Sequence, residues 1–204
     1  MSKRNRFQQN FWKYLLVVLV PIVVWYTVFY FVYRVKDNEQ VQIMFLGKDL
    51  DNSALKGELT TNLTNIAGEK LKSVTVRSTV VANGNGQILS AYQVVYDIII
   101  FSESYLPENV GQNWGFAHFE QEKFVELFGA DVELYSEVYE ETTLYYAVEI
   151  PADSFFAQYY SGEEKCYMFF SPETVNLASL NGNGNASDDG AIRIAQYLLS
   201  SANR

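Results

Sequence analysis

DIIIF, at residues 97–101, is the clearest buried strand in the sequence, because four large apolar side chains follow one aspartate. Three consecutive isoleucines favour extended backbone, since β-branched side chains fit the pleated surface of a sheet. The run lacks polar alternation, which indicates a strand that is covered on both faces. Strands of this kind belong to parallel sheets, so the run predicts an α/β domain.

The residues before this strand predict further alternation of strands and helices. Residues 41–47 (VQIMFLG) form an apolar run, and residues 71–81 (LKSVTVRSTVV) alternate and are rich in β-branched side chains. A helix is expected between them, with Asp51 or Asn52 as its cap and Gly68 at its end. Its apolar side chains recur at helical spacing, at Leu55, Leu59, Leu63 and Ile66. With a short helix near residues 88–95, this order is typical of parallel strands joined by right-handed crossovers.

The residues after this strand are less regular. We expect a helix at 119–128, strands at 142–150 (TTLYYAVEI) and 166–170 (CYMFF), and a final helix at 190–201. The acidic side chains between the first two of these elements are interpreted as a solvated face: Glu137, Glu140 and Glu141. The predicted fold class is therefore α/β, with helices on both faces of a mainly parallel sheet.

Residues 14–33 (YLLVVLVPIVVWYTVFYFVY) are twenty residues without a charge. As a helix they would cover about 30 Å, the thickness of a bilayer core. Four basic residues precede the run and two follow it, which favours a cytoplasmic N-terminus. The sequence thus predicts a cytoplasmic tail at 1–13, a membrane helix at 14–33 in the lipid bilayer of the cell, and an extracytoplasmic domain at 38–204. A cleaved signal peptide and a buried core helix are the alternatives.

Charge differs sharply between the two parts of the chain. Residues 1–34 contain five basic and no acidic side chains, whereas residues 35–204 contain ten basic and twenty-four acidic ones. Such an acidic surface repels nucleic acid, so no nucleic-acid partner is expected. Cys166 is the single cysteine, which excludes an intrachain disulfide framework and a lipid-modified cysteine at the membrane exit.

Polar side chains follow two of the predicted strands. In open α/β sheets, ligands bind outside the carboxyl ends of the strands. Polarity that is ordinary for loops is the competing interpretation. The acidic surface disfavours a strongly anionic ligand, so a small neutral or weakly charged ligand is expected. The candidate ligand-binding residues are Lys48, Asp49, Ser102, Glu103, Ser104 and Tyr105.

Two other stretches contain side chains that occur in binding sites. Trp114, Phe116, His118 and Phe119 suit either an aromatic platform for a sugar or peptide, or core packing. Residues 181–189 place oxygen-bearing side chains at alternate positions, but they lack the glycine and the glutamate of a calcium loop. No cofactor and no metal are therefore expected, and no catalytic set of residues stands out.

The pattern resembles a known family. The order VQIMFLG, a leucine-spaced helix, LKSVTV and then YDIIIFSES (96–104) resembles the first lobe of bilobed extracellular solute-binding proteins. The later KCYMFFSPETVNLASLNG (165–182) and DDGAIRIAQYLL (188–199) resemble the closing part of small membrane-anchored relatives from Gram-positive bacteria. The resemblance implies a sheet with a cleft at its strand ends and, at this length, a reduced second lobe.

Three functions fit these observations. The first is a non-enzymatic, membrane-anchored module that binds a small molecule or docks to a membrane protein partner. The second is a cell-envelope hydrolase that uses Glu103 and Asp49 as acid and base, which requires a defined separation of the two carboxylates. The third is a structural subunit of a membrane complex.

Overall fold

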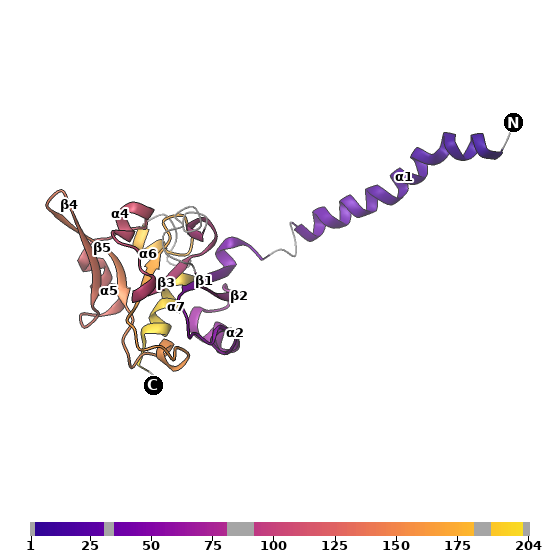
Figure 1. The fold of residues 1–204 in the computed structure, drawn as a ribbon. Helices are drawn as coiled ribbons and strands as arrows, with labels where there is room; N and C mark the ends of the chain where they lie inside the picture. Colours follow the sequence, from indigo (N-terminus) through magenta and orange to yellow (C-terminus); the bar gives the residue numbers. More distant parts are fainter. Residues whose placement is uncertain (1–2, 31–34, 81–91, 182–188, 202–204) are drawn as a thin grey trace. The chain divides into compact units, whose positions relative to one another are not determined.

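The computed structural model of the 204-residue chain describes residues 3–30, 35–80, 92–181 and 189–201. The chain divides into two compact units, Met1–Lys36 and Asp37–Arg204. Figure 1 shows the helix of the first unit and the mixed helices and strands of the second. We describe each unit by itself.

The first unit consists of α1 (Lys3–Val28), a helix of 26 residues that continues through Pro21. The apolar side chains in its second half are exposed on all sides of the helix, with Val17 and Trp25 at 71% and 68%. Among the residues that the structure describes, no helix meets the length and apolar character that are needed to cross a membrane. Residues 31–33 of the predicted span lie outside the described residues.

The second unit is an α/β fold built on one six-stranded sheet with the strand order β2-β1-β3-β6-β5-β4. β1 pairs in parallel with β2 and β3, whereas the β3–β6, β6–β5 and β5–β4 pairs are antiparallel. The sheet is therefore mixed, and the expectation of a mainly parallel sheet is wrong. The strands are β1 (Gln40–Leu46), β2 (Ser73–Thr79), β3 (Ile98–Ser102), β4 (Leu134–Tyr139), β5 (Thr142–Glu149) and β6 (Cys166–Phe170).

The antiparallel half arises because its connections differ from those of the parallel half. β4 and β5 are joined by a tight hairpin in which Glu140 and Glu141 have positive φ angles of 44° and 70°. A turn this short can only join antiparallel strands, whereas parallel strands need a crossover. β4 and β5 extend the same sheet that β1 begins, so they do not form the reduced second lobe that was expected.

β3 is the central strand and is buried on both faces, as its sequence predicts. Ile98 and Ile100 pack into one apolar cluster, and Ile99 and Phe101 pack into another on the opposite face. This alternation follows the two-residue period of a strand, which points successive side chains to opposite faces. Each such buried side chain contributes about 1.5–3 kcal/mol relative to an exposed one.

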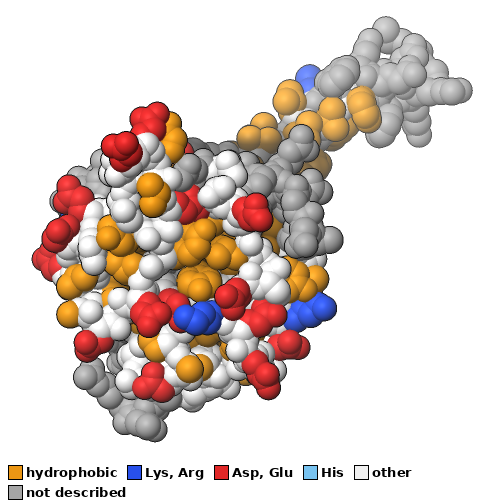
Figure 2. Space-filling view, turned by 60° about the vertical axis from the view of Figure 1, so that its left-hand side comes forward, with side chains coloured by type: hydrophobic (Ala, Val, Ile, Leu, Met, Phe, Trp, Pro, Cys, Tyr) orange, Lys and Arg blue, Asp and Glu red, His pale blue; other side chains and the backbone are white. Residues whose placement is uncertain are grey.

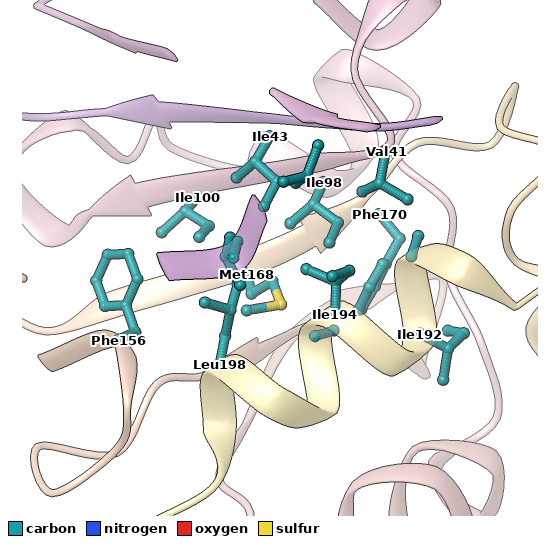
Figure 3. Packing of buried hydrophobic residues seen from close by; sticks show 14 of the residues in the cluster. Val41, Ile43, Ile98, Ile100, Phe156, Met168, Phe170, Ile192, Ile194 and Leu198 are labelled. Atoms are coloured by element: carbon teal, nitrogen blue, oxygen red, sulfur yellow. The ribbon is translucent and has the colours of Figure 1, made fainter. Parts of the chain in front are cut away.

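Helices cover the larger of the two clusters. α2 (Asn52–Ala67) contributes its leucines, and α7 (Gly190–Leu199) contributes Ile194 and Leu198. Figure 3 shows these two α7 side chains directed toward Met168 and the strands above them. The predicted α2 signals are confirmed, because the Asp51 carboxylate accepts a hydrogen bond from Ala54 N at 2.9 Å and Gly68 ends the helix with φ 80°.

Shorter elements complete the second unit. The smaller apolar cluster is covered by α4 and by residues 92–96, of which residues 92–95 are helical. The rest of the predicted short helix, residues 88–91, lies outside the described part of the chain. The remaining elements are η2 (Asp37–Glu39), η3 (Glu103–Tyr105), α4 (Val110–Trp114), α5 (Gln121–Phe128), η4 (Phe156–Gln158) and α6 (Ala178–Asn181).

A buried polar cluster, here called the Asp97 cluster, closes the sheet at the amino ends of β1 and β3. The Asp97 carboxylate accepts hydrogen bonds from Gln42 N at 2.7 Å, from Asn176 Nδ2 at 3.0 Å and from the Thr174 hydroxyl. Asn176 Nδ2 also donates to the carbonyl of Gln40 at 2.9 Å. Burial raises the pKa of Asp97 above its ordinary value, and the three hydrogen bonds oppose that rise. The cluster ties β1, β3 and the segment after β6 together.

Candidate functional site

A polar cavity, here called the strand-end cavity, lies at the carboxyl ends of β1 and β3. The two strands are parallel neighbours, so the loops that follow them, at residues 47–51 and 103–105, meet at one edge of the sheet. β6 is antiparallel to β3 and pairs Cys166 with Ser102, so the segment before β6 reaches the same edge. Three segments that are far apart in the sequence therefore enclose one space.

The strand-end cavity has a volume of about 430 Å³. Five of the six candidate ligand-binding residues line it, namely Lys48, Asp49, Ser102, Ser104 and Tyr105. Glu103 does not line it; its side chain is exposed, and its backbone N–H donates to the carbonyl of Lys165 at 2.9 Å. The remaining lining residues were not predicted: Tyr160, Ser161, Gly162, Glu163 and Glu164.

The loop after β1 is held against the segment before β6. Asp49 adopts a positive φ of 67°, and its carbonyl accepts hydrogen bonds from Ser161 N at 2.9 Å and Ser161 Oγ at 3.2 Å. The next residues continue the contact, because Leu50 bridges to Tyr160 as an isolated antiparallel pair. Backbone bonds thus fix this wall of the cavity without help from a ligand.

The loop after β3 is held by a carboxylate. Glu164 Oε2 accepts hydrogen bonds from Ser104 Oγ at 2.7 Å and from Ser104 N at 3.2 Å. These two bonds lower the pKa of Glu164 below its ordinary value, so the carboxylate is ionised at neutral pH. Glu164 therefore fixes the second wall and also places a negative charge on the cavity.

Aromatic rings and a thiol pack at the base of this region. The Tyr160 ring contacts Phe45 and Phe156 at centroid distances of 5.7 and 6.0 Å. Burial raises the pKa of the Tyr160 phenol, and burial raises the pKa of the Cys166 thiol to about 12. Both groups are therefore neutral at physiological pH, and Cys166 lacks the thiolate that a nucleophile needs.

Two positions near the cavity require glycine, because neighbouring side chains lie too close to the backbone for a Cβ atom. A Cβ on Gly47 would lie 2.7 Å from both Ser102 Oγ and the Phe45 ring, and a Cβ on Gly162 would lie 2.3 Å from the Tyr160 ring. Any larger residue at either position would displace a neighbour that shapes the cavity. The cavity thus depends on glycine in two of its three segments.

The charges around the strand-end cavity are unequal. Its lining contains three acidic residues, Asp49, Glu163 and Glu164, and one basic residue, Lys48. The hydrolase hypothesis paired Asp49 with Glu103, but the structure does not bring Glu103 into the lining. That pair is therefore not gathered in this cavity.

A second hollow of about 890 Å³ lies between α4, α5 and the β4–β5 hairpin, and it is wide and open. It includes three of the aromatic candidates. Phe116 is buried and contacts Phe169 at 4.8 Å between centroids, which confirms core packing for this residue. His118 is exposed and lies edge-on to Tyr146, while Phe119 lies edge-on to Phe124. The side chain of Trp114 lies outside the described part of the structure.

The hairpin beside this hollow contains one buried carboxylate. Glu137 is 7% exposed, and its Oε1 accepts hydrogen bonds from Gly111 N at 2.8 Å and Tyr135 Oη at 3.1 Å. The interpretation of Glu137 as part of a solvated face is therefore wrong, whereas Glu140 and Glu141 are exposed as expected. Glu137 links β4 to the start of α4.

The calcium-like stretch falls mostly outside the described residues, which omit 182–188. Asp189 is described, and its carboxylate accepts hydrogen bonds from Ser179 N at 2.7 Å and from the Ser179 hydroxyl. Within the described ranges, no group of three or more His, Cys, Asp or Glu side chains is arranged to hold a metal ion.

Comparisons of the chain with protein-family models, with curated proteins and with solved structures found no match.

Proposed function

We propose that this chain is a non-enzymatic binding module that holds a small polar ligand in the strand-end cavity, and that residues 14–33 tether the module to the cell membrane. The observation that carries the binding part is the cavity itself. It lies where two parallel strands end, and three separate segments of the chain line it. Ligands of open α/β sheets occupy this position.

The size and polarity of the cavity support a small polar ligand. A volume of about 430 Å³ falls within the range of small-molecule sites. Serine hydroxyls, tyrosine hydroxyls and charged groups line it, so a ligand with several hydrogen-bonding groups would find partners there. The walls are fixed by Ser161–Asp49 and Ser104–Glu164 bonds, which reduces the ordering cost of binding.

A ligand screen tests the binding part. The full chain in a nonionic detergent would be screened by thermal shift against sugars, amino acids, short peptides and small amines, with calorimetry of each hit. Ser161→Trp places a large ring in the cavity from an exposed position, and we expect it to abolish binding. Gln158→Trp adds the same bulk at an exposed residue outside the lining, and we expect it to bind normally.

Two outcomes would contradict the binding part. One is a screen without any hit, which would leave docking to a membrane protein partner as the better function. The other is a hit that Ser161→Trp and Gln158→Trp bind equally well, because that ligand would occupy another place on the protein.

The tether rests on the sequence of residues 14–33 and on the exposed apolar side chains of α1. The second half of α1 has apolar side chains on every side, which favours an apolar environment such as a bilayer. The excess of basic residues before the run favours a cytoplasmic N-terminus. Protease added to intact cells should then digest residues 38–204, and full protection of that region would refute this topology.

A further inference from the structure

The charge around the strand-end cavity points to the kind of ligand it accepts. Three acidic residues and one lysine line the cavity, so the lining has a net negative charge. The acidic character extends over the domain, since residues 35–204 contain more than twice as many acidic as basic side chains. Figure 2 shows Asp and Glu side chains spread over one face with few Lys and Arg between them. This field attracts cations and repels anions.

The basic residue that is adjacent to Glu164 in the sequence does not neutralise the charge of the cavity. Lys165 follows Glu164, but its ammonium lies 2.8 Å from Glu149 and 3.7 Å from Glu133, both outside the lining. Lys48 is the cation that lines the cavity, and a single ammonium balances one of the three carboxylates. The excess negative charge is therefore a property of the cavity itself.

One of the negative groups, the Glu164 carboxylate, is positioned before any ligand arrives. Ser104 holds Glu164 through two hydrogen bonds, and Ser161 holds the backbone of Asp49 through two more. The same cavity presents the aromatic side chains of Tyr105 and Tyr160. Tyrosine rings attract cations at their faces, so they add to the attraction that the carboxylates supply.

A metal ion fits this arrangement poorly. A metal requires several oxygen ligands converging on one point. Within the described ranges, no group of three or more His, Cys, Asp or Glu side chains is arranged in that way, and Asp49, Glu163 and Glu164 lie within those ranges. A ligand that meets them must contact them at separate points, as an organic molecule of several atoms does.

We infer that the ligand of the strand-end cavity is a small organic cation, a primary amine with a polar body, which is attracted by the net negative charge that Asp49, Glu163 and Glu164 give the lining. This inference rests on the proposed binding function and narrows it from neutral or weakly charged ligands to positively charged ones. The polar body of the amine would meet the hydroxyl groups of the lining.

Three probes of equal length separate charge from shape: 4-aminobutan-1-ol is a cation, butane-1,4-diol is neutral, and 4-hydroxybutanoate is an anion. Each would be titrated into the full chain in nonionic detergent and followed by saturation-transfer NMR. We expect the cation to bind at least about tenfold more tightly than the diol at low salt. The advantage should shrink at 0.5 M salt, because screening weakens interactions between exposed charges.

Substitutions that remove either a negative or a positive charge from the lining make the test more specific. Glu163→Gln should weaken binding of the cation about three- to tenfold and leave the diol unchanged, since one attractive charge is lost. Lys48→Gln should strengthen binding of the cation by a similar factor, because it removes the competing ammonium. Glu103→Gln removes an exposed charge from the neighbouring loop but not from the lining, and we expect only a small effect.

The outcomes separate failure of the cationic ligand from failure of the binding function. Equal or tighter binding of the diol or the anion would overturn the cationic ligand while the binding function stands. A cation whose affinity is unchanged by both Glu163→Gln and Lys48→Gln would also overturn it. If none of the three probes binds at 50 mM, the cationic ligand is rejected, and the broader screen decides separately whether the binding function survives.

Discussion

Acidic side chains lie at both ends of β1 and β3, but they are buried at one end and exposed at the other. At the amino ends, the Asp97 carboxylate is buried and accepts hydrogen bonds from three donors of the same domain. At the carboxyl ends, Asp49, Glu163 and Glu164 are exposed and line a space of about 430 Å³. One end is filled by the protein, and the other is open.

This difference separates stability from binding. A buried polar group is stabilising only when its partners are present, because losing one leaves the other unsatisfied away from water. An exposed polar group exchanges its partners with water at little cost, so it remains available to a ligand. We therefore expect substitutions at the amino ends to lower the free energy of unfolding and those at the carboxyl ends to affect mainly binding.

The largest effect should come from Ile99→Asp, which places a carboxylate only two residues beyond Asp97 in the same strand. Ile99 is fully buried in an apolar cluster, so the new carboxylate would have no donor. We expect a loss of at least about 4 kcal/mol in the free energy of unfolding. Urea denaturation would measure it, with Ile99→Val as a control that costs about 1 kcal/mol. An Ile99→Asp protein that is as stable as Ile99→Val would contradict the core position of this side chain.

Asp97→Ala should cost about 3 kcal/mol, because it leaves three donors without their acceptor. Asp97→Asn tests the charge separately. Burial raises the folded-state pKa of Asp97, so the folded state binds this proton more tightly than the unfolded state. Stability from this group is therefore present at low pH and declines as pH rises through the raised pKa.

The stability of the wild-type protein minus that of Asp97→Asn should accordingly fall between acidic and neutral pH in urea denaturation. Subtracting the variant removes the contributions of the other titrating groups. A difference that does not depend on pH, or that rises with pH, would contradict the role assigned to burial.

Local signals in the sequence predicted local structure well. DIIIF is buried on both faces, the Asp51 cap and the Gly68 stop are in place, and the loops after β1 and β3 meet. The direction of β6 could not be predicted, because an apolar run such as CYMFF is the same in parallel and antiparallel strands. The residues before β6 were therefore missed as cavity lining, although YSGEE (160–164) is a conspicuous polar turn.

β4 was missed for a different reason. Its sequence, LYSEVY, exposes Val138 at 70% and buries Glu137 at 7%, which reverses the usual pattern of polarity. Tyr135 Oη, a donor to Glu137, lies in β4 itself, but the other donor, Gly111 N, is supplied by the tertiary fold. No pattern along the strand contains that information.

Glu137→Ala should therefore have the third-largest effect, a loss of about 2 kcal/mol, because a buried backbone N–H loses its acceptor. Glu140→Ala, at an exposed position in the adjacent turn, is the control and should change stability by less than about 0.5 kcal/mol. Chemical denaturation of both variants would measure the difference. Equal effects would mean that Glu137 does not anchor the hairpin to α4.

The smallest effect on stability should come from Ser104→Ala at the open end. Two bonds from Ser104 lower the pKa of Glu164, and the substitution removes the hydroxyl bond. A lowered carboxylate pKa contributes stability above the unfolded-state pKa, and this stability is lost as pH falls through the folded-state pKa. Because Glu164 is exposed, solvent screening should keep the change in stability below about 0.5 kcal/mol.

The pKa of Glu164 should nevertheless change. NMR of the Glu164 carboxyl carbon should show a higher pKa in Ser104→Ala than in the wild-type protein, because the ionised form has lost a donor. Ser161→Ala is the matched control, since its hydroxyl donates to the carbonyl of Asp49 and not to Glu164. An unchanged Glu164 pKa in Ser104→Ala, or a loss of stability as large as that of Asp97→Ala, would remove the distinction between the two ends of the sheet. A raised pKa with stability preserved would show that Ser104 holds the charge of Glu164 in position without being required for folding.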